Sequence, residues 1–191
     1  MTKPRFVLMP PAAAAPATVL ACARAAVAAG DCASIILAAP AAFARDNVAA
    51  LQGLGLAVLL QDAEPRQMHH VKADGLHLTA AKDLREVRAA LKDSHILGVD
   101  CAASRHAAME AAEAGADYVG FHQTAQVKGE PLLRWWGDIA EVPAVALDPV
   151  DAAALATLQP QRPDFVTPDA RLWDSPEAAR QIITALAKAL S

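Results

Sequence analysis

The sequence predicts an α/β fold, a compact (β/α)8 TIM barrel formed as a single domain over residues 1–191. Strand-like and helix-like segments alternate from end to end, which is typical of a parallel sheet covered by helices. Eight such units follow one another without a shift in composition. An open doubly wound sheet is the alternative, but no GxGxxG turn follows the first apolar run. Because about 250 residues is typical of a barrel, tight loops are expected.

Composition excludes several classes of protein. The net charge of −4 and the lack of a basic cluster argue against nucleic-acid binding. No apolar run approaches the roughly 20 residues of a membrane span, and prolines interrupt the N-terminal apolar segment, so neither a membrane protein nor a signal peptide is expected. Cys22, Cys32 and Cys101 are scattered without CxxC spacing. This favours a reducing cytoplasm, with all three thiols as small core residues.

The first half of the chain supplies four expected strands, each followed by a helix. Thr18 is the expected N-cap of the first helix, Pro40 opens the second helical region, and Thr79 is expected to cap the fourth helix. The expected strands are Phe6–Met9, Ser34–Leu37, Leu56–Leu60 and Gly75–Leu78, and the helices run from Thr18 to Ala29, Pro40 to Gly53 or Gly55, Pro65 to Lys72 and Ala80 to Leu91.

The second half repeats this pattern around the segment from Glu110 to Gln123. Gly115 is placed to end a helix in the left-handed conformation, and a β-prone run follows it. His122 and Gln123 are the first polar side chains after that run, at the edge where barrels bind ligands. The expected strands are Ile96–Val99, Asp117–Phe121, Val142–Leu147 and Asp164–Thr167, and the helices begin near Ser104, Leu132, Asp151 and Pro176.

Three segments stand out: DGLHL at 74–78, ILGV at 96–99 and EAGADYVGF at 113–121. They resemble one known family, that of thiamine-phosphate synthase and thiazole tautomerase. The run Asp74-Gly75-Leu76-His77-Leu78 is similar to the DG[VI]HL strand of the family. Ile96-Leu97-Gly98-Val99 resembles its fifth strand, and Glu113 to Phe121 resembles its EAGADYVGxG strand. Arg134-Trp135-Trp136 and Val142 to Ala146 stand where the family has a helix and a PVVAIGG strand. This chain would be a divergent member.

The resemblance implies a transferase of thiamine biosynthesis that joins a pyrimidine diphosphate to a thiazole phosphate and releases pyrophosphate with the help of Mg²⁺. Asp62 matches the metal-binding aspartate of the family, and Asp83 matches the second one if the preceding turn holds one extra residue. Lys128 falls near the pyrophosphate-binding lysine. His77 and Gln123 are further candidates for contacts with the substrate. Carboxylates and a cation are what a leaving diphosphate requires.

The chain departs from the family where phosphate is bound. The second expected strand ends in Leu37, Ala38 and Ala39, with no basic side chain to hold a diphosphate. The family's glycine pair after the seventh strand is replaced by Asp148-Pro149, and proline lacks the N–H that a phosphate would need. The eighth strand ends in Thr167-Pro168-Asp169. Both phosphorylated substrates are therefore expected to bind poorly.

Two alternatives to the synthase stay open. One is an enzyme of the thiazole tautomerase type in which His122 transfers protons as a general acid and base. The other is a non-catalytic binding or regulatory barrel that has lost its phosphate sites. In each case the expected ligand is a small molecule related to the pyrimidine or the thiazole, and the sequence allows a homodimer. His69 and His70 are expected on the surface of the third helix, since adjacent helical residues point apart.

Overall fold

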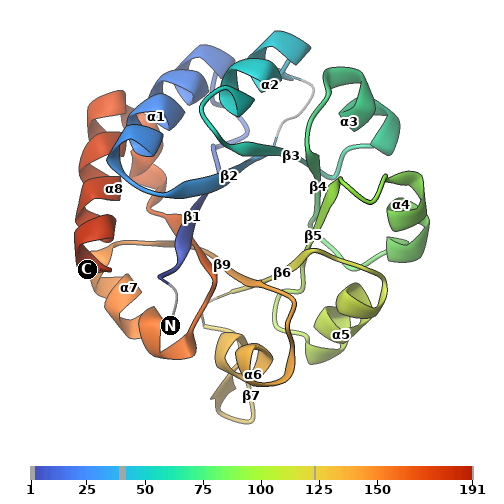
Figure 1. Ribbon diagram of the computed structural model, residues 1–191. Helices are drawn as coiled ribbons and strands as arrows, with labels where there is room; N and C mark the ends of the chain where they lie inside the picture. Colours follow the sequence, from blue (N-terminus) through green and yellow to red (C-terminus); the bar gives the residue numbers. More distant parts are fainter. Residues whose placement is uncertain (1–2, 39–41, 123, 191) are drawn as a thin grey trace.

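The chain folds into a closed barrel of parallel strands with the helices arranged around the outside (Figure 1). The computed structural model describes residues 3–38, 42–122 and 124–190. Within these ranges the strand order around the barrel is β1-β10-β9-β6-β5-β4-β3-β2, and β2 pairs with β1 to close the ring. The predicted (β/α)8 barrel is confirmed. In the described part of the chain, no helix has the length and apolar character to cross a membrane.

Each barrel strand is followed by a helix, as the alternating pattern predicts. The barrel strands are β1 (Arg5–Leu8), β2 (Cys32–Leu37), β3 (Ala57–Gln61), β4 (Gly75–Leu78), β5 (Ile96–Asp100), β6 (Tyr118–Phe121), β9 (Ala144–Val150) and β10 (Phe165–Pro168). The α-helices are α1 (Pro16–Ala29), α2 (Arg45–Gln52), α3 (Pro65–Val71), α4 (Leu84–Ala90), α5 (Arg105–Glu113), α6 (Leu132–Ile139), α7 (Ala152–Leu158) and α8 (Pro176–Ala189).

Three short elements were not expected from the sequence. A two-stranded hairpin, β7 (Gln126–Val127) and β8 (Glu130–Pro131), lies between β6 and α6. Two 3₁₀ helices, η2 (Gln159–Gln161) and η3 (Ala170–Asp174), lie on either side of β10. The hairpin gives too few residues for a period-2 pattern to be recognised.

Some predicted helix starts were wrong. Helix α1 begins at Pro16 with Ala15 as its N-cap, because proline at the first helical position already has the helical φ, and Thr18 lies inside the first turn. Helix α4 begins only at Leu84, because Thr79 binds a neighbouring strand end instead of capping a helix. The predicted opening of the second helix at Pro40 lies outside the described residues. The left-handed conformation of Gly115 is confirmed, with a φ of 87°.

Alternating strand residues divide the apolar core into two clusters. The larger cluster lies between the strands and the helices. The smaller cluster fills the inside of the barrel. Its members come from five strands and lie on the strand faces that point away from the helices. These inner residues are Val7, Ile36, Leu59, Tyr118, Val145 and Leu147. All three cysteines are buried and free, as predicted, and His69 and His70 are exposed on α3, also as predicted.

Three strands are each preceded by an aspartate whose carboxylate accepts a hydrogen bond from the backbone of the neighbouring strand. Asp74 Oδ2 accepts the Val58 N–H at 2.7 Å. Asp117 Oδ2 accepts the Leu97 N–H at 2.8 Å. The Asp164 carboxylate accepts the Ala144 N–H in the same way, at 2.8 Å. The aspartates of the DGLHL and GADYV segments therefore hold the barrel closed at its N-terminal end.

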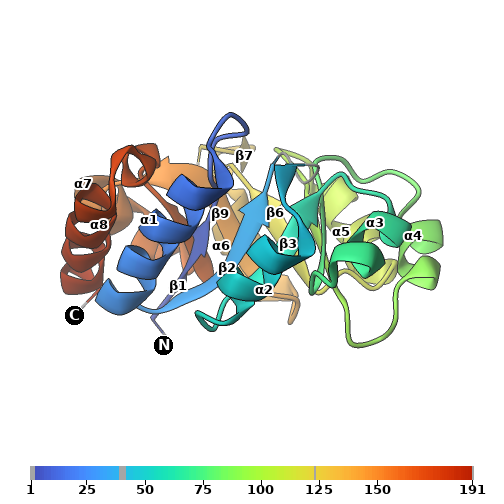
Figure 2. The same cartoon turned by 90° about the horizontal axis from the view of Figure 1, so that it is seen from above.

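The opposite end of the barrel consists of the carboxyl ends of the barrel strands and the loops that follow them. We call this end the mouth. In Figure 2 both chain termini lie along the lower edge, and the label of β7 stands at the upper edge, over the mouth. In TIM barrels this is the end where active sites form.

Candidate active site at the barrel mouth

Four polar side chains come from the ends of four consecutive barrel strands. Asp62 follows β3, His77 lies in β4, Asp100 ends β5 and His122 follows β6. The strands pair in register, with Gln61 opposite His77 and Asp100 opposite Gly120, so these groups follow one another along one arc of the barrel. The charge of Asp100 reaches both histidines: it opposes the lowering of the His77 pKa by burial, and it adds to the raising of the His122 pKa by Asp148. The mouth is thus rich in groups that take up and release protons.

His122 and Asp148 form the hydrogen-bonded pair of this site. They meet because β6 and β9 are neighbours, with Phe121 opposite Ala146. The distance from His122 Nδ1 to Asp148 Oδ1 is 2.6 Å, and 47% of the His122 side chain is exposed. The hydrogen bond to Asp148 raises the pKa of His122 above its ordinary value, against a smaller opposing effect of burial. An imidazole oriented by a carboxylate is the usual arrangement of a general acid and base, with Nε2 left to meet a substrate.

Asp62 uses both of its carboxylate oxygens on Thr79. Oδ1 accepts the Thr79 N–H at 2.9 Å, and Oδ2 accepts the Thr79 hydroxyl at 2.7 Å. Asp62 itself has a φ of 48°, in the left-handed region that a short polar side chain tolerates better than most. This contact ties the loops after β3 and β4 together at the rim of the mouth.

His77 lies below the rim and is only 1% exposed. Its Nδ1 is 2.8 Å from the Tyr118 hydroxyl, and the two rings stack with planes 9° apart. Burial lowers the pKa of His77 to about 4. Tyr118 can cross the barrel here because Gly98 faces it: a Cβ on Gly98 would lie 1.9 Å from Tyr118 Cζ. The pair forms a neutral, buried floor beneath the mouth.

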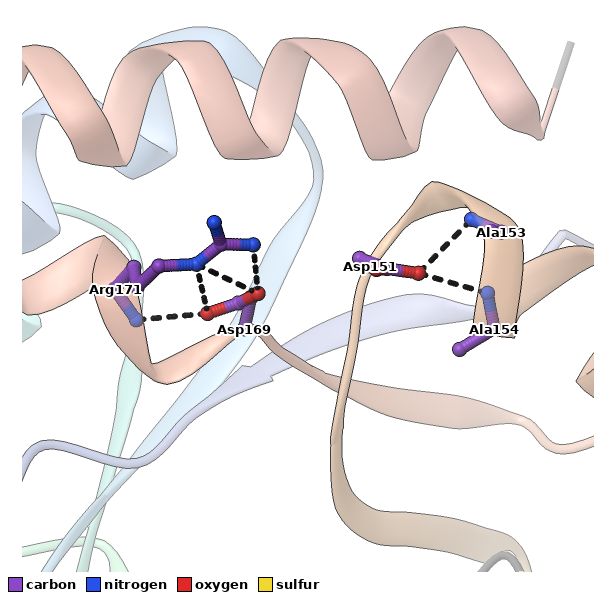
Figure 3. Close-up of polar contacts among 5 residues, drawn as sticks. All are labelled: Asp151, Ala153, Ala154, Asp169 and Arg171. Carbon is purple, nitrogen blue, oxygen red and sulfur yellow. Dashed lines mark hydrogen bonds and ion pairs between the residues drawn. The ribbon is translucent and has the colours of Figure 1, made fainter.

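Across the mouth from Asp62 and His77, an aspartate in each of the loops after β9 and β10 accepts hydrogen bonds from backbone N–H groups that follow it in the chain (Figure 3). Asp151 Oδ1 accepts the N–H groups of Ala153 and Ala154 at 3.0 and 2.8 Å, and so caps α7. Asp169 Oδ1 accepts the Arg171 N–H at 2.9 Å, and both Asp169 oxygens contact the Arg171 guanidinium group. These hydrogen bonds from Arg171 lower the pKa of Asp169.

The sequence can now be compared with known proteins. The family model described as thiamine monophosphate synthase matches residues 7–161. The thiamine-phosphate synthase of Hyphomonas neptunium is 32% identical over 152 residues, which cover 73% of this chain and 68% of that protein. The thiamine-phosphate synthase of Erythrobacter litoralis is 37% identical over 120 residues. This chain belongs to the thiamine monophosphate synthase family.

The matches span only part of some relatives, and proteins outside the family share the fold. The match spans 56% of the Erythrobacter litoralis protein and 65% of the thiamine-phosphate synthase of Rhodospirillum centenum, so less than two thirds of either relative. The structure of thiamine phosphate pyrophosphorylase from Pyrococcus furiosus superposes with a TM-score of 0.77 over 97% of this chain and 95% of that one, at 16% identity. A 3-hexulose-6-phosphate synthase superposes with a TM-score of 0.72, also at 16% identity. The fold is therefore shared with another reaction, and the site must supply the function.

The residues matched to the family's metal and diphosphate positions are spread out in this member. Asp83 is the N-cap residue of α4 but makes no side-chain cap hydrogen bond. Its Oδ2 is 4.0 Å from Lys82 Nζ, and it lines a groove between α4 and α5. Lys128 is exposed in the turn of the β7–β8 hairpin, with a φ of 54°. Gln123 lies outside the described residues. Among the described residues, neither Asp83 nor Lys128 contacts Asp62.

Asp62 and Asp83 are the carboxylates that the resemblance assigns to a magnesium ion. Mg²⁺ prefers carboxylate oxygens in an octahedral arrangement. Each Asp62 oxygen already accepts a hydrogen bond from Thr79, and Asp83 directly precedes α4 at its N-cap position. Over residues 3–38, 42–122 and 124–190, no three His, Cys, Asp or Glu side chains gather in a way that could hold a metal ion. The described residues therefore form no preassembled protein cage for Mg²⁺, an ion that proteins usually hold with one or two carboxylates together with substrate phosphates and water.

Sequence reasoning selected His122 but not its partner. Asp148 was recognised only as a replacement for a glycine, and a strand end 26 residues further along the chain gives no local sign of contact. Tyr118 was read as part of a buried strand. One signal could have revealed it, since Gly98 stands opposite Tyr118 in neighbouring strands and leaves room for the ring.

Proposed function

We propose that this chain acts in thiamine biosynthesis, and that it moves protons on one of the heterocyclic precursors of thiamine at the barrel mouth. Family membership supports the pathway. The observation that carries the reaction type is the 2.6 Å contact between His122 Nδ1 and Asp148 Oδ1. Asp148 holds the imidazole ring in place and stabilises its protonated form, so Nε2 can give a proton to a bound ring or take one from it.

The geometry supports an isomerase of the thiazole tautomerase type best. Such a reaction shifts a proton between two positions of one substrate, so a single histidine can remove it and return it. The reaction needs neither a leaving diphosphate nor a metal clamp. The surroundings of His122 suit this chemistry: Asp100 and Asp148 favour the protonated ring, while the exposed part of the side chain admits a ligand.

The coupling of a pyrimidine diphosphate to a thiazole phosphate is the second candidate. Three curated relatives named thiamine-phosphate synthase, 31 to 37% identical, favour it. Asp62 stands at the rim of the mouth, where the resemblance places a metal ligand. Mg²⁺, Asp83, Lys128 and Gln123 remain part of this candidate, which requires these groups to rearrange when a diphosphate binds.

Product analysis separates the two reactions. The purified protein would be incubated with the pyrimidine diphosphate, the thiazole phosphate and Mg²⁺, and thiamine phosphate would be measured. The thiazole substrate, with and without its phosphoryl group, would be incubated separately and its isomers resolved by NMR. His122→Ala should reduce isomerisation by about 100-fold or more, within the range that a general acid–base group contributes.

His106→Ala is the matched control. His106 Nε2 also has a carboxylate partner, Glu110 at 3.4 Å, but it lies exposed on α5. Its replacement should leave the rate unchanged. Thiamine phosphate formation that depends on Asp62 and Mg²⁺ would instead establish the coupling reaction. A protein that forms neither product while binding the thiazole would be the non-catalytic barrel.

A further inference from the structure

We propose that Asp151 and Asp169 replace a substrate phosphate, so that the ligand of this mouth is an unphosphorylated heterocycle. TIM barrels commonly bind phosphate with the loops after the seventh and eighth strands and the start of a short extra helix. This chain has all three parts: the ends of β9 and β10, and η3. Here the protein's own carboxylates bind the backbone groups of that position. The inference names the substrate class for the proposed function and rests on it.

In the loop after β9, three backbone donors are already used. The N–H groups of Ala153 and Ala154 donate to Asp151 Oδ1, and that of Leu155 donates to the Asp151 carbonyl. Pro149 has no N–H to offer. Asp148, which precedes it, is hydrogen-bonded to His122. A phosphate entering here would have to displace a carboxylate that already caps α7.

Three backbone donors after β10 are used in the same way. The Arg171 N–H donates to Asp169 Oδ1, and the Leu172 N–H donates to the Asp169 carbonyl. The N–H of Asp169 itself donates to the carbonyl of Val150 on the neighbouring strand. Arg171 is a cation beside this position, and its guanidinium group already contacts both oxygens of Asp169.

Charge opposes phosphate as strongly as the hydrogen bonding does. Asp148, Asp151 and Asp169 stand at the ends of two adjacent strands, and the pairing of Pro168 with Val150 keeps these ends together. A phosphate ester would bring about two further negative charges to them. Like charges at this separation repel each other, whereas a neutral alcohol at the same place meets no such repulsion. Asp151 and Asp169 are therefore specificity-determining residues that select the ligand without its phosphoryl group.

Isothermal titration tests this with three probes: inorganic phosphate, the thiazole phosphate, and the corresponding thiazole alcohol. The wild type is compared with the double variant Asp151→Ser/Asp169→Ser. Serine keeps an N-cap hydroxyl but removes the charge, which allows both loops to keep their shape. Asp138→Asn is the matched control, because it removes one carboxylate from an ion pair with Arg162, which precedes β10 at the other end of the barrel.

The wild type should bind the alcohol at least as tightly as the phosphate ester. The double variant should gain about 10-fold or more in affinity for inorganic phosphate and for the ester, with the alcohol unchanged. A wild type that binds the ester about 10-fold more tightly than the alcohol would overturn the inference, as would a double variant that gains nothing. The titration with inorganic phosphate does not depend on whether the protein binds a thiazole. If phosphate binding is gained but no thiazole binds to any variant, the closed position is supported and the proposed function fails.

Discussion

Acidification should destabilise this protein through His77. The side chain is 1% exposed and bonded to Tyr118, and burial lowers its pKa from 6.5 to about 4. In the unfolded chain the His77 imidazole therefore binds a proton below about pH 6.5, whereas in the folded chain it binds one only below about pH 4. Stability is fully present above the unfolded value and is lost as the pH falls between the two values.

The magnitude follows from the two pKa values. At about 1.4 kcal/mol for each pH unit, the interval from 6.5 to about 4 amounts to about 3 kcal/mol. Between about pH 7 and about pH 4.5, the loss attributable to His77 should be about 2.5 kcal/mol. This is a large fraction of the stability of an ordinary domain, which is about 5–15 kcal/mol.

Urea unfolding at several pH values provides the assay, with His77→Asn as the test variant. Asparagine offers a polar atom near the position of Nδ1 but does not titrate, so the variant should lose about 2.5 kcal/mol less than the wild type over the same interval. Tyr118→Phe is the control: it keeps the titrating ring and should cost about 1–3 kcal/mol at every pH, because the buried Nδ1 loses its partner. Parallel loss in the wild type and His77→Asn would refute the reasoning.

Three further predictions concern packing, strand fastening and charge. Gly98→Ala should destabilise the fold by about 1–3 kcal/mol, because the added Cβ would lie 1.9 Å from Cζ of the rigid Tyr118 ring, and thermal unfolding would measure it. Asp117→Ala should cost about 1–3 kcal/mol in urea unfolding, since it leaves the N–H at the start of β5 without its acceptor. Asp148→Asn should lower the pKa of His122 in an NMR titration, because the hydrogen bond that His122 donates to the Asp148 carboxylate raises it. The raised pKa of His122 means that this pair stabilises the fold below the unfolded pKa and ceases to do so as the pH rises through the folded one.

The first two of these predictions have controls. Gly137→Ala adds a Cβ with no atom within 4 Å in α6, and should raise stability by about 0.5–1 kcal/mol. Glu113→Ala removes an exposed carboxylate near Asp117 in sequence and should change stability little. An unchanged melting temperature for Gly98→Ala, or an unchanged His122 titration in Asp148→Asn, would show that the corresponding contact is absent.

The barrel could be predicted from the sequence because its determinants are local. Apolar runs such as Leu56–Leu60 and the glycine stop at Gly115 identify strands and helix ends within a few residues. Burial of the cysteines follows from residue type alone. The start of α4 could not be predicted, because Asp62, 17 residues away in the chain, binds Thr79 and delays the helix.

The candidate site was only partly predictable, for the same reason. His122 could be selected as the first polar side chain after a strand. Its pairing with Asp148 depends on two strands that lie side by side only in the closed barrel. The roles of Asp151 and Asp169 depend on hydrogen bonds within loops, and the residue types alone allow either solvated charges or caps.

Exchange of solvent deuterium into the thiazole alcohol is the most direct test of a proton-transferring mouth. The purified protein is incubated with the thiazole in D₂O, and NMR follows the loss of ring or side-chain proton signals. The wild type and His106→Ala should catalyse exchange, while His122→Ala should be slower by about 100-fold or more. Exchange at the same rate in His122→Ala and the wild type would contradict the account, because the proton would then move without the His122–Asp148 pair.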